Sequence, residues 1–309
     1  MLDRYLVFAL LSAVFMASSG IIARFSALSA AELTFYRLAV GALCLALLLL
    51  GSGQLRQLRH IPDRMVLLNG ILLASFMLCF LQAIETISLA NAIMLVYLAP
   101  PLTALAAHWL YQEKLSRHSV LLIGLSVFGF AMLQQFQLSL AMTPAQLPGF
   151  IFGLCSLLAY AAYLLLNRKP AASQSLYQRT FYQLLIGAVC VLPFLTDAQL
   201  PATDQLLWIA LAGIFPGFLA ILTALAALQH LPTRVYGTLA YLEPVTVILA
   251  GWWLFAEQLS WLQAGGVLLI LSCGVAQAAL PRTAQYPTPT VPPEDLAATG
   301  TPPQSGSAP

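Results

Sequence analysis

Two charged side chains, Arg37 and Glu243, stand inside long apolar stretches of this chain. A charged residue at the centre of an apolar helix in a bilayer costs about 2.5–3.5 kcal/mol, so we expect both side chains to face protein or water and not lipid. A cation and an anion placed there can hold the opposite charges of a small molecule, and the carboxyl group can carry a proton. Two structural interpretations remain open: the two side chains pair with each other, or Arg37 extends to the outer membrane interface.

Five tyrosines in the apolar stretches can complete a binding site around these charges. Their hydroxyl groups donate and accept hydrogen bonds, while their rings suit an apolar setting. These tyrosines are Tyr97, Tyr160, Tyr163, Tyr236 and Tyr241. We predict that they bind a small-molecule substrate together with Arg37 and Glu243.

The sequence lacks the common motifs of hydrolytic enzymes and of ATP-driven pumps. The sequence contains no H-E-x-x-H metal motif, no G-x-S-x-G nucleophile elbow and no G-x-x-x-x-G-K-[ST] phosphate loop. The four histidines also lack the spacing of metal ligands: His60, His108, His118 and His230. We therefore expect a protein that is not an enzyme and that uses neither a metal ion nor another cofactor.

The composition excludes an ordinary soluble protein. Of the 309 residues, 60% are hydrophobic and 8% are charged, and the mean hydropathy is +0.86. Soluble domains contain about 25% charged residues because their surfaces face water. Most of this surface must therefore face the lipid bilayer. The formal net charge of only +2 provides no basic patch for nucleic acid, and the sequence leaves the oligomeric state open.

Ten apolar stretches have about the length that crosses the hydrocarbon core of a bilayer. Their limits are 5–23, 32–50, 65–84, 90–111, 118–136, 149–166, 177–195, 206–226, 235–254 and 261–280. Because lipid offers the backbone no hydrogen bonds, we predict an all-α membrane protein with ten transmembrane helices. Prolines inside these stretches, at Pro100, Pro216 and Pro244, predict kinks.

The distribution of Lys and Arg predicts the orientation in the membrane. Short loops rich in these residues stay in the cytoplasm. If the N-terminus is inside, eleven cations lie in or beside the inner segments, and the outer loops contain only Arg24. We therefore predict a multi-pass protein of the inner (plasma) membrane with both termini in the cytoplasm.

The chain contains an internal repeat. A shift of 144 residues aligns 97–116 with 241–260, and ten of these 20 positions are identical, Trp109/Trp253 and Glu113/Glu257 among them. We predict one five-helix repeat over 5–136, a second over 149–280, and a disordered Pro-rich tail over 281–309. Because five is odd, the second repeat enters the membrane from the opposite side, which gives inverted repeats.

The repeated stretch resembles the EamA repeats of the drug/metabolite transporter superfamily. In each copy a Leu and a Pro precede, by some twelve residues, a Glu that is followed by Leu-Ser, and the second span begins with Phe35-Tyr36-Arg37. The glutamates, Glu113 and Glu257, lie beside Ser116 and Ser260, which can cap the following helices, and we interpret them as structural. The resemblance implies export of amino acids, other metabolites or drugs through a central cavity between the halves.

These features favour a secondary transporter. We expect an exporter of amino acids, related small metabolites or drug-like amines that works by alternating access, in which a central site opens in turn to each side of the membrane. The sequence leaves two alternatives, a passive channel and an intramembrane hydrolase.

Overall fold

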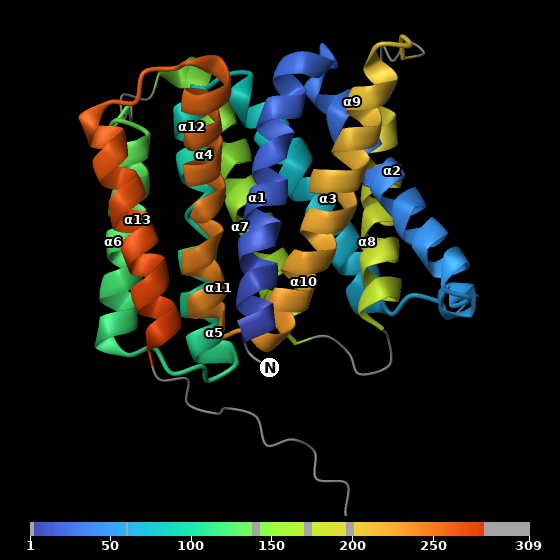
Figure 1. The fold of residues 1–309 in the computed structure, drawn as a ribbon, viewed down its shortest axis with the longest axis horizontal. Coiled ribbons are helices and arrows are strands. Elements are labelled where there is room, and N and C mark those ends of the chain that lie inside the picture. The colour runs from blue at the N-terminus through green and yellow to red at the C-terminus, as the bar shows by residue number, and fades with distance from the viewer. Residues whose placement is uncertain (1–2, 60, 138–142, 170–174, 196–200, 281–309) are drawn as a thin grey trace, which may run out of the picture.

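The computed structural model describes residues 3–59, 61–137, 143–169, 175–195 and 201–280, and every regular element in these ranges is a helix. The long helices run side by side and form one bundle (Figure 1). The predicted tail, residues 281–309, lies outside the described residues.

The first half of the chain forms six α-helices and a short 3₁₀ helix, η1. They are α1 (Asp3–Ser26), α2 (Ala30–Gly51), η1 (Leu55–Arg59), α3 (Arg64–Ile84), α4 (Leu89–Val96), α5 (Ala99–Leu110) and α6 (Arg117–Leu133).

The second half repeats this order with more interruptions. Its elements are η2 (Pro144–Gln146), α7 (Leu147–Arg168), α8 (Leu176–Val191), η3 (Leu192–Phe194), α9 (Gln205–Ala212), the π-helical η4 (Gly213–Leu219), α10 (Ala220–His230), α11 (Thr233–Ala240), α12 (Leu242–Phe255) and α13 (Trp261–Ala279).

Eight helical segments of the described chain are long and apolar enough to cross a membrane. The predicted all-α, multi-pass class is therefore confirmed. The predicted number of ten crossings is not confirmed: α6, with 17 residues, is shorter than the 18 residues that each of the eight segments has at least, and α8 is not among those segments.

Serine side chains fix where several of these helices begin. Each accepts a hydrogen bond from the backbone N–H three residues further on and so satisfies a donor that the first helical turn leaves unpaired. These serines are Ser29, Ser88, Ser116, Ser175 and Ser260. The caps predicted at Ser116 and Ser260 are therefore present.

Three long segments are interrupted near the prolines that predicted kinks. The α4–α5 segment breaks at Tyr97–Leu98, the α11–α12 segment breaks at Tyr241, and Pro216 lies within the π-helical η4. Proline lacks the N–H that would bond the carbonyl four residues earlier, so the regular helix stops before Pro100 and Pro244. The two tyrosines at the breaks are aligned by the 144-residue shift.

Helices of the two halves pack against one another throughout the bundle. Helix α3 packs on α7 and α8, α1 packs on α10 and η4, and α2 packs on α8 and η4. The α6–α13 pair and the α2–α8 pair form opposite edges, and α1 begins at the end of the bundle where α13 ends (Figure 1). The main buried core lies between these halves.

Two glycines allow η4 to approach α2 at the level of Arg37. A Cβ atom on Gly217 would fall on the backbone carbonyl oxygen of Arg37, and a Cβ atom on Gly41 would lie 3.0 Å from the carbonyl carbon of Gly217. Small residues permit such close approach between membrane helices. The contact holds the backbone of Arg37 in place from the opposite half of the chain.

Candidate functional site

The two charges inside the apolar spans, Arg37 and Glu243, lie near each other. Arg37 is in the first half of α2, and Glu243 is in the first turn of α12, directly after the break at Tyr241. The two side chains interact electrostatically, and both are half-buried. The Arg37 Nη2 atom donates to the Met77 sulfur at 3.0 Å, whereas its buried Nε has no hydrogen-bond partner among the described residues. Arg37 thus retains hydrogen-bonding capacity for another group.

The breaks in the two long segments are joined by tyrosines. The hydroxyl group of Tyr241 donates to the backbone carbonyl oxygen of Tyr97 at 2.6 Å, and their ring centroids are 6.0 Å apart. The Tyr97 side chain in turn interacts with the Glu243 carboxyl group. Carbonyl groups freed by a broken helix must find partners in the protein when lipid surrounds it, and the Tyr241 hydroxyl supplies one. Glu243, in the second half of the chain, therefore interacts with two residues of the first half, Arg37 and Tyr97.

The remaining three predicted tyrosines extend this cluster onto α7 and α11. Tyr160 interacts electrostatically with Arg37, Tyr236 and Glu243. The ring of Tyr160 stacks on that of Phe76, with centroids 4.6 Å apart. Tyr160 therefore lies beside the two charged side chains and packs on Phe76 of α3.

Tyr163 and Tyr236 lie deeper in the protein. They interact with each other, and Tyr236 also interacts with Ser12 on α1. Both tyrosines are buried, as is Tyr241, whereas Tyr97 and Tyr160 are half-buried like the two charges. The seven residues singled out by the sequence therefore form one connected cluster, which we call the central cluster, with four accessible members and three supporting ones.

The central cluster can bind a molecule that carries both charges. Arg37 can hold a carboxylate group, Glu243 can hold an ammonium group or a proton, and the tyrosine hydroxyl groups can orient both. No group of three or more His, Cys, Asp or Glu side chains that could hold a metal ion occurs in the part of the chain that the structure describes.

A buried ion pair that the sequence analysis missed joins the two halves near one end of the bundle. The Arg168 Nε atom donates to Glu113 Oε1 at 2.6 Å, and the backbone N–H and hydroxyl group of Thr233 donate to Glu113 Oε2 at 2.9 and 2.6 Å. Glu113 and Arg168 are only 5% and 7% exposed. Glu113 therefore connects α5 to α7 and α11.

An exposed ion pair has the corresponding position near the opposite end. The Arg24 Nη1 atom lies 2.6 Å from Glu257 Oε1, and these side chains are 55% and 54% exposed. The 144-residue shift that aligns Glu113 with Glu257 also aligns Arg168 with Arg24. The internal repeat therefore carried a signal for both ion pairs, because it aligns the arginines as well as the glutamates.

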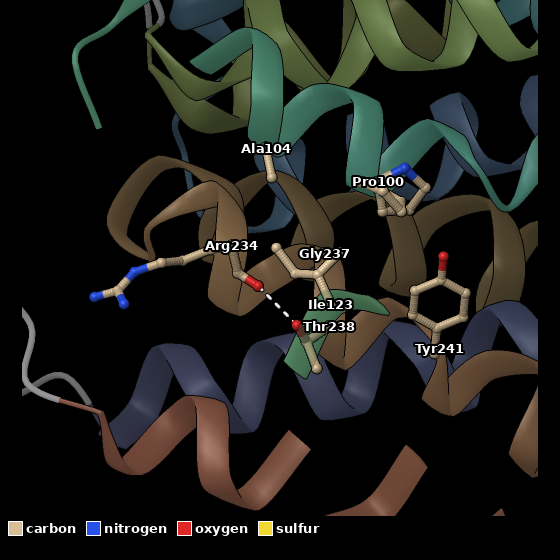
Figure 2. A pocket seen from close by; sticks show the side chains of 8 residues that line it. Pro100, Ala104, Ile123, Arg234, Gly237, Thr238 and Tyr241 are labelled. Carbon is tan, nitrogen blue, oxygen red and sulfur yellow. Dashed lines mark hydrogen bonds between the residues drawn. The ribbon is translucent and has the colours of Figure 1, made fainter. Parts of the chain in front are cut away.

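A small space beside the Tyr241 break adjoins the central cluster but lies away from its two charged side chains. It is bounded by residues of α5, α6 and α11 together with Tyr241 (Figure 2). On its α11 side the Thr238 hydroxyl group donates to the Arg234 carbonyl oxygen one turn earlier, while the Arg234 guanidinium points away and donates to Ser119. Neither Arg37 nor Glu243 lines this space. We therefore locate the candidate site at the central cluster.

Comparisons with known proteins identify the class of molecule. A sequence model of the EamA-like transporter family matches the chain twice, over residues 3–134 and 147–276. The chain is 28% identical to the pseudopaline exporter CntI of Pseudomonas aeruginosa over 251 residues, which cover 80% of this chain and 85% of the exporter. It is also 28% identical to an uncharacterized transporter of Archaeoglobus fulgidus over 271 residues, 85% of this chain and 92% of that transporter.

Two further matches agree in length and in fold. An uncharacterized transporter of Pseudomonas aeruginosa, PA0485, is 31% identical over 242 residues, 74% of this chain and 78% of the relative. A solved crystal structure superimposes with a TM-score of 0.79 at 20% identity and covers 90% of this chain and 98% of its own, which shows a shared fold. The relatives are named as transporters and the family model covers most of the chain, so this protein is a membrane transporter and not an enzyme. It belongs to the EamA-like transporter family.

Proposed function

We propose that this protein is a secondary transporter that exports small metabolites bearing both an amine and a carboxylate, such as amino acids and related compounds, by alternating access. The observation that carries the proposal is the central cluster, in which Arg37 and Glu243 lie beside the breaks of two aligned helical segments. Discontinuous helices near the midplane form the substrate sites of many secondary transporters. The exporter named among the relatives supports outward transport.

The proposed mechanism requires two inverted five-helix repeats, 5–136 and 149–280, with ten crossings. Two observations support this arrangement. The family model matches each half separately. In addition, contacts between the halves have counterparts in which the corresponding helices have changed places: α3 packs on α7, and its counterparts η4 and α10 pack on α1; α2 packs on η4, and their counterparts α8 and α3 pack on each other. In the proposed architecture α6 and α8 supply the two crossings that are shorter than the others.

The orientation that we propose places both termini in the cytoplasm, with the protein in the inner membrane. The start of α1 and the end of α13 lie at one end of the bundle (Figure 1). Arg64, Arg117 and Arg168 stand at ends of α3, α6 and α7, which the proposal assigns to that same side. The positive-inside rule supports this choice.

Reporter fusions test the crossings and their orientation. A fusion after Gln57 is expected to report the cytoplasmic side, and a fusion after Gln137 the opposite side, because three proposed crossings (α3, α4–α5 and α6) separate them. A pair of reporters sensitive to opposite compartments, alkaline phosphatase and a fluorescent protein, makes the assignment. If both positions report the same side, the number of crossings is even between them and the inverted repeat is wrong.

Export is tested by comparing metabolites in the medium of cells with and without the protein. We expect at least one amino acid or related zwitterion to accumulate outside only when the protein is present. The purified protein in sealed vesicles should then show saturable flux of that compound and counterflow of labelled substrate. Flux that neither saturates nor shows counterflow indicates a passive channel. If none of the amino acids or their relatives changes, the proposed substrate class is wrong.

A further inference from the structure

The Glu113 carboxylate caps the first turn of α11, a helix that belongs to the other half of the chain. Helix α11 begins at Thr233 after Pro232, which provides no side-chain cap, so its first N–H groups need another acceptor. Glu113 Oε2 accepts from the N–H and hydroxyl groups of Thr233, while Oε1 is held by Arg168. A negative charge at a helix N-terminus is also favoured by the helix dipole. These bonds keep α5, α7 and α11 together at this end.

The local geometry that presents Glu113 recurs at Glu257. Each glutamate follows a residue with a left-handed backbone, Gln112 at φ 55° and Ala256 at φ 52°. The N–H of Glu113 donates to Ala107 at 3.2 Å, and the N–H of Glu257 donates to Gly251 at 3.3 Å. The 144-residue shift aligns each of these pairs. Glu257 is therefore built to present its carboxylate as Glu113 does.

The partner helix is not engaged at this second end. The shift aligns Thr233, the first residue of α11, with Leu89, the first residue of α4. Leu89 is 55% exposed, and no hydrogen bond joins Glu257 to α4 in the part of the chain that the structure describes. The Glu257 carboxylate accepts a hydrogen bond from Arg24 and remains half exposed. At the first end Glu113 thus joins three parts of the chain, whereas at the other end Glu257 joins only two.

We propose that Glu113 and Glu257 are alternating latches, a role that rests on the proposed transport by alternating access. Glu113 on the start of α11 closes one end of the bundle in the state seen here. When that contact is released, the halves rock and Glu257, still paired with Arg24, caps the N–H of Leu89 at the start of α4 and closes the other end. The two contacts exclude each other, because in alternating access only one end of the bundle is closed at a time while the central cluster is open to the other.

Distances across the two ends test the latches. Nitroxide labels on cysteines at His118 and His230 report one end, and labels at the aligned positions Leu262 and Thr86 report the other; all four positions are exposed. The five native cysteines form no disulfide and can be replaced beforehand. Pulsed electron paramagnetic resonance of the full chain in lipid nanodiscs gives the populations without any substrate.

Substitutions of the two glutamates should move these populations in opposite directions. Glu113→Gln is expected to lengthen the His118–His230 distance and shorten the Thr86–Leu262 distance, with a population ratio changed about tenfold or more. Glu257→Gln should shift the ratio the other way by about two- to fivefold, because its ion pair is exposed. Thr233→Val removes only one hydrogen bond and should follow Glu113→Gln with a smaller change; it carries the test if Glu113→Gln does not fold.

The distances and substrate flux, measured on the same preparations, separate the two proposals. Opposite shifts in Glu113→Gln and Glu257→Gln support the latches, whatever the flux shows. If the wild type transports but neither glutamate moves the distances, or both move them in one direction, the latches are wrong and transport stands. If the shifts occur but no zwitterion is transported, the latches stand and the proposed function is wrong.

Discussion

Replacing Glu243 with glutamine is expected to lower the affinity for an amine-bearing substrate by about thirtyfold or more. The substitution preserves size and polarity but removes the negative charge that interacts with Arg37 and, in the proposal, with the substrate ammonium group. Removing one member of a buried charged contact typically costs about 2–5 kcal/mol. Concentration dependence of flux in vesicles, at several pH values, measures the effect.

The pH profile separates two roles of Glu243. If it holds the amine, affinity falls at every pH; if it carries a coupling proton, accumulation driven by a pH gradient disappears while exchange of substrate persists. Glu85→Gln is the matched control, because Glu85 is an exposed carboxylate at the end of α3 and outside the central cluster. A Glu243→Gln protein with wild-type affinity and wild-type pH dependence would contradict both roles and leave Glu243 as a structural partner of Arg37.

Replacing Arg168 with methionine is expected to destabilise the protein by about 3–5 kcal/mol. The substitution leaves the Glu113 carboxylate buried without its cationic partner, although the two bonds from Thr233 remain. Unfolding of the purified protein by sodium dodecyl sulfate in mixed micelles measures the free energy.

The repeat supplies the control for this prediction. Arg24→Met removes the aligned, exposed ion pair, and surface pairs contribute about 0–1 kcal/mol, so this variant should unfold nearly as the wild type does. Equal stability of the Arg168→Met and Arg24→Met proteins would show that burial of the Glu113 pair contributes nothing to folding.

The apolar stretches and prolines predicted most of the fold because those signals are local. Each predicted span overlaps helix in the described residues, and the breaks before Pro100 and Pro244 follow from a missing N–H. The ends were less predictable. Helix α6 stops at Leu133, three residues before the predicted limit, because Gln135 and Phe136 adopt positive φ angles of 53° and 52°. Neither is a glycine, so the sequence carries no stop signal there.

The members of the central cluster were predictable because the cost of exposing a charge to lipid does not depend on how the helices pack. Arg37 and Glu243 therefore had to turn inward, and the tyrosines near them in the fold joined the cluster. The buried pair of Glu113 and Arg168 was missed for a different reason. Both residues stand at span ends, where a charge can as easily face water, and only tertiary packing decides which pair is covered: Glu113 with Arg168 is buried, whereas Glu257 with Arg24 is not.

Both ion pairs run between the halves: Arg24 of the first reaches Glu257 of the second, and Glu113 of the first reaches Arg168 of the second. Each half therefore needs only one arginine and one glutamate to contribute to both. A single five-helix chain with those two residues would form the same two contacts by pairing with an upside-down copy of itself, as the self-complementary surface of an isologous dimer does. Within one chain the two pairs can differ, and here one is buried while its counterpart is exposed.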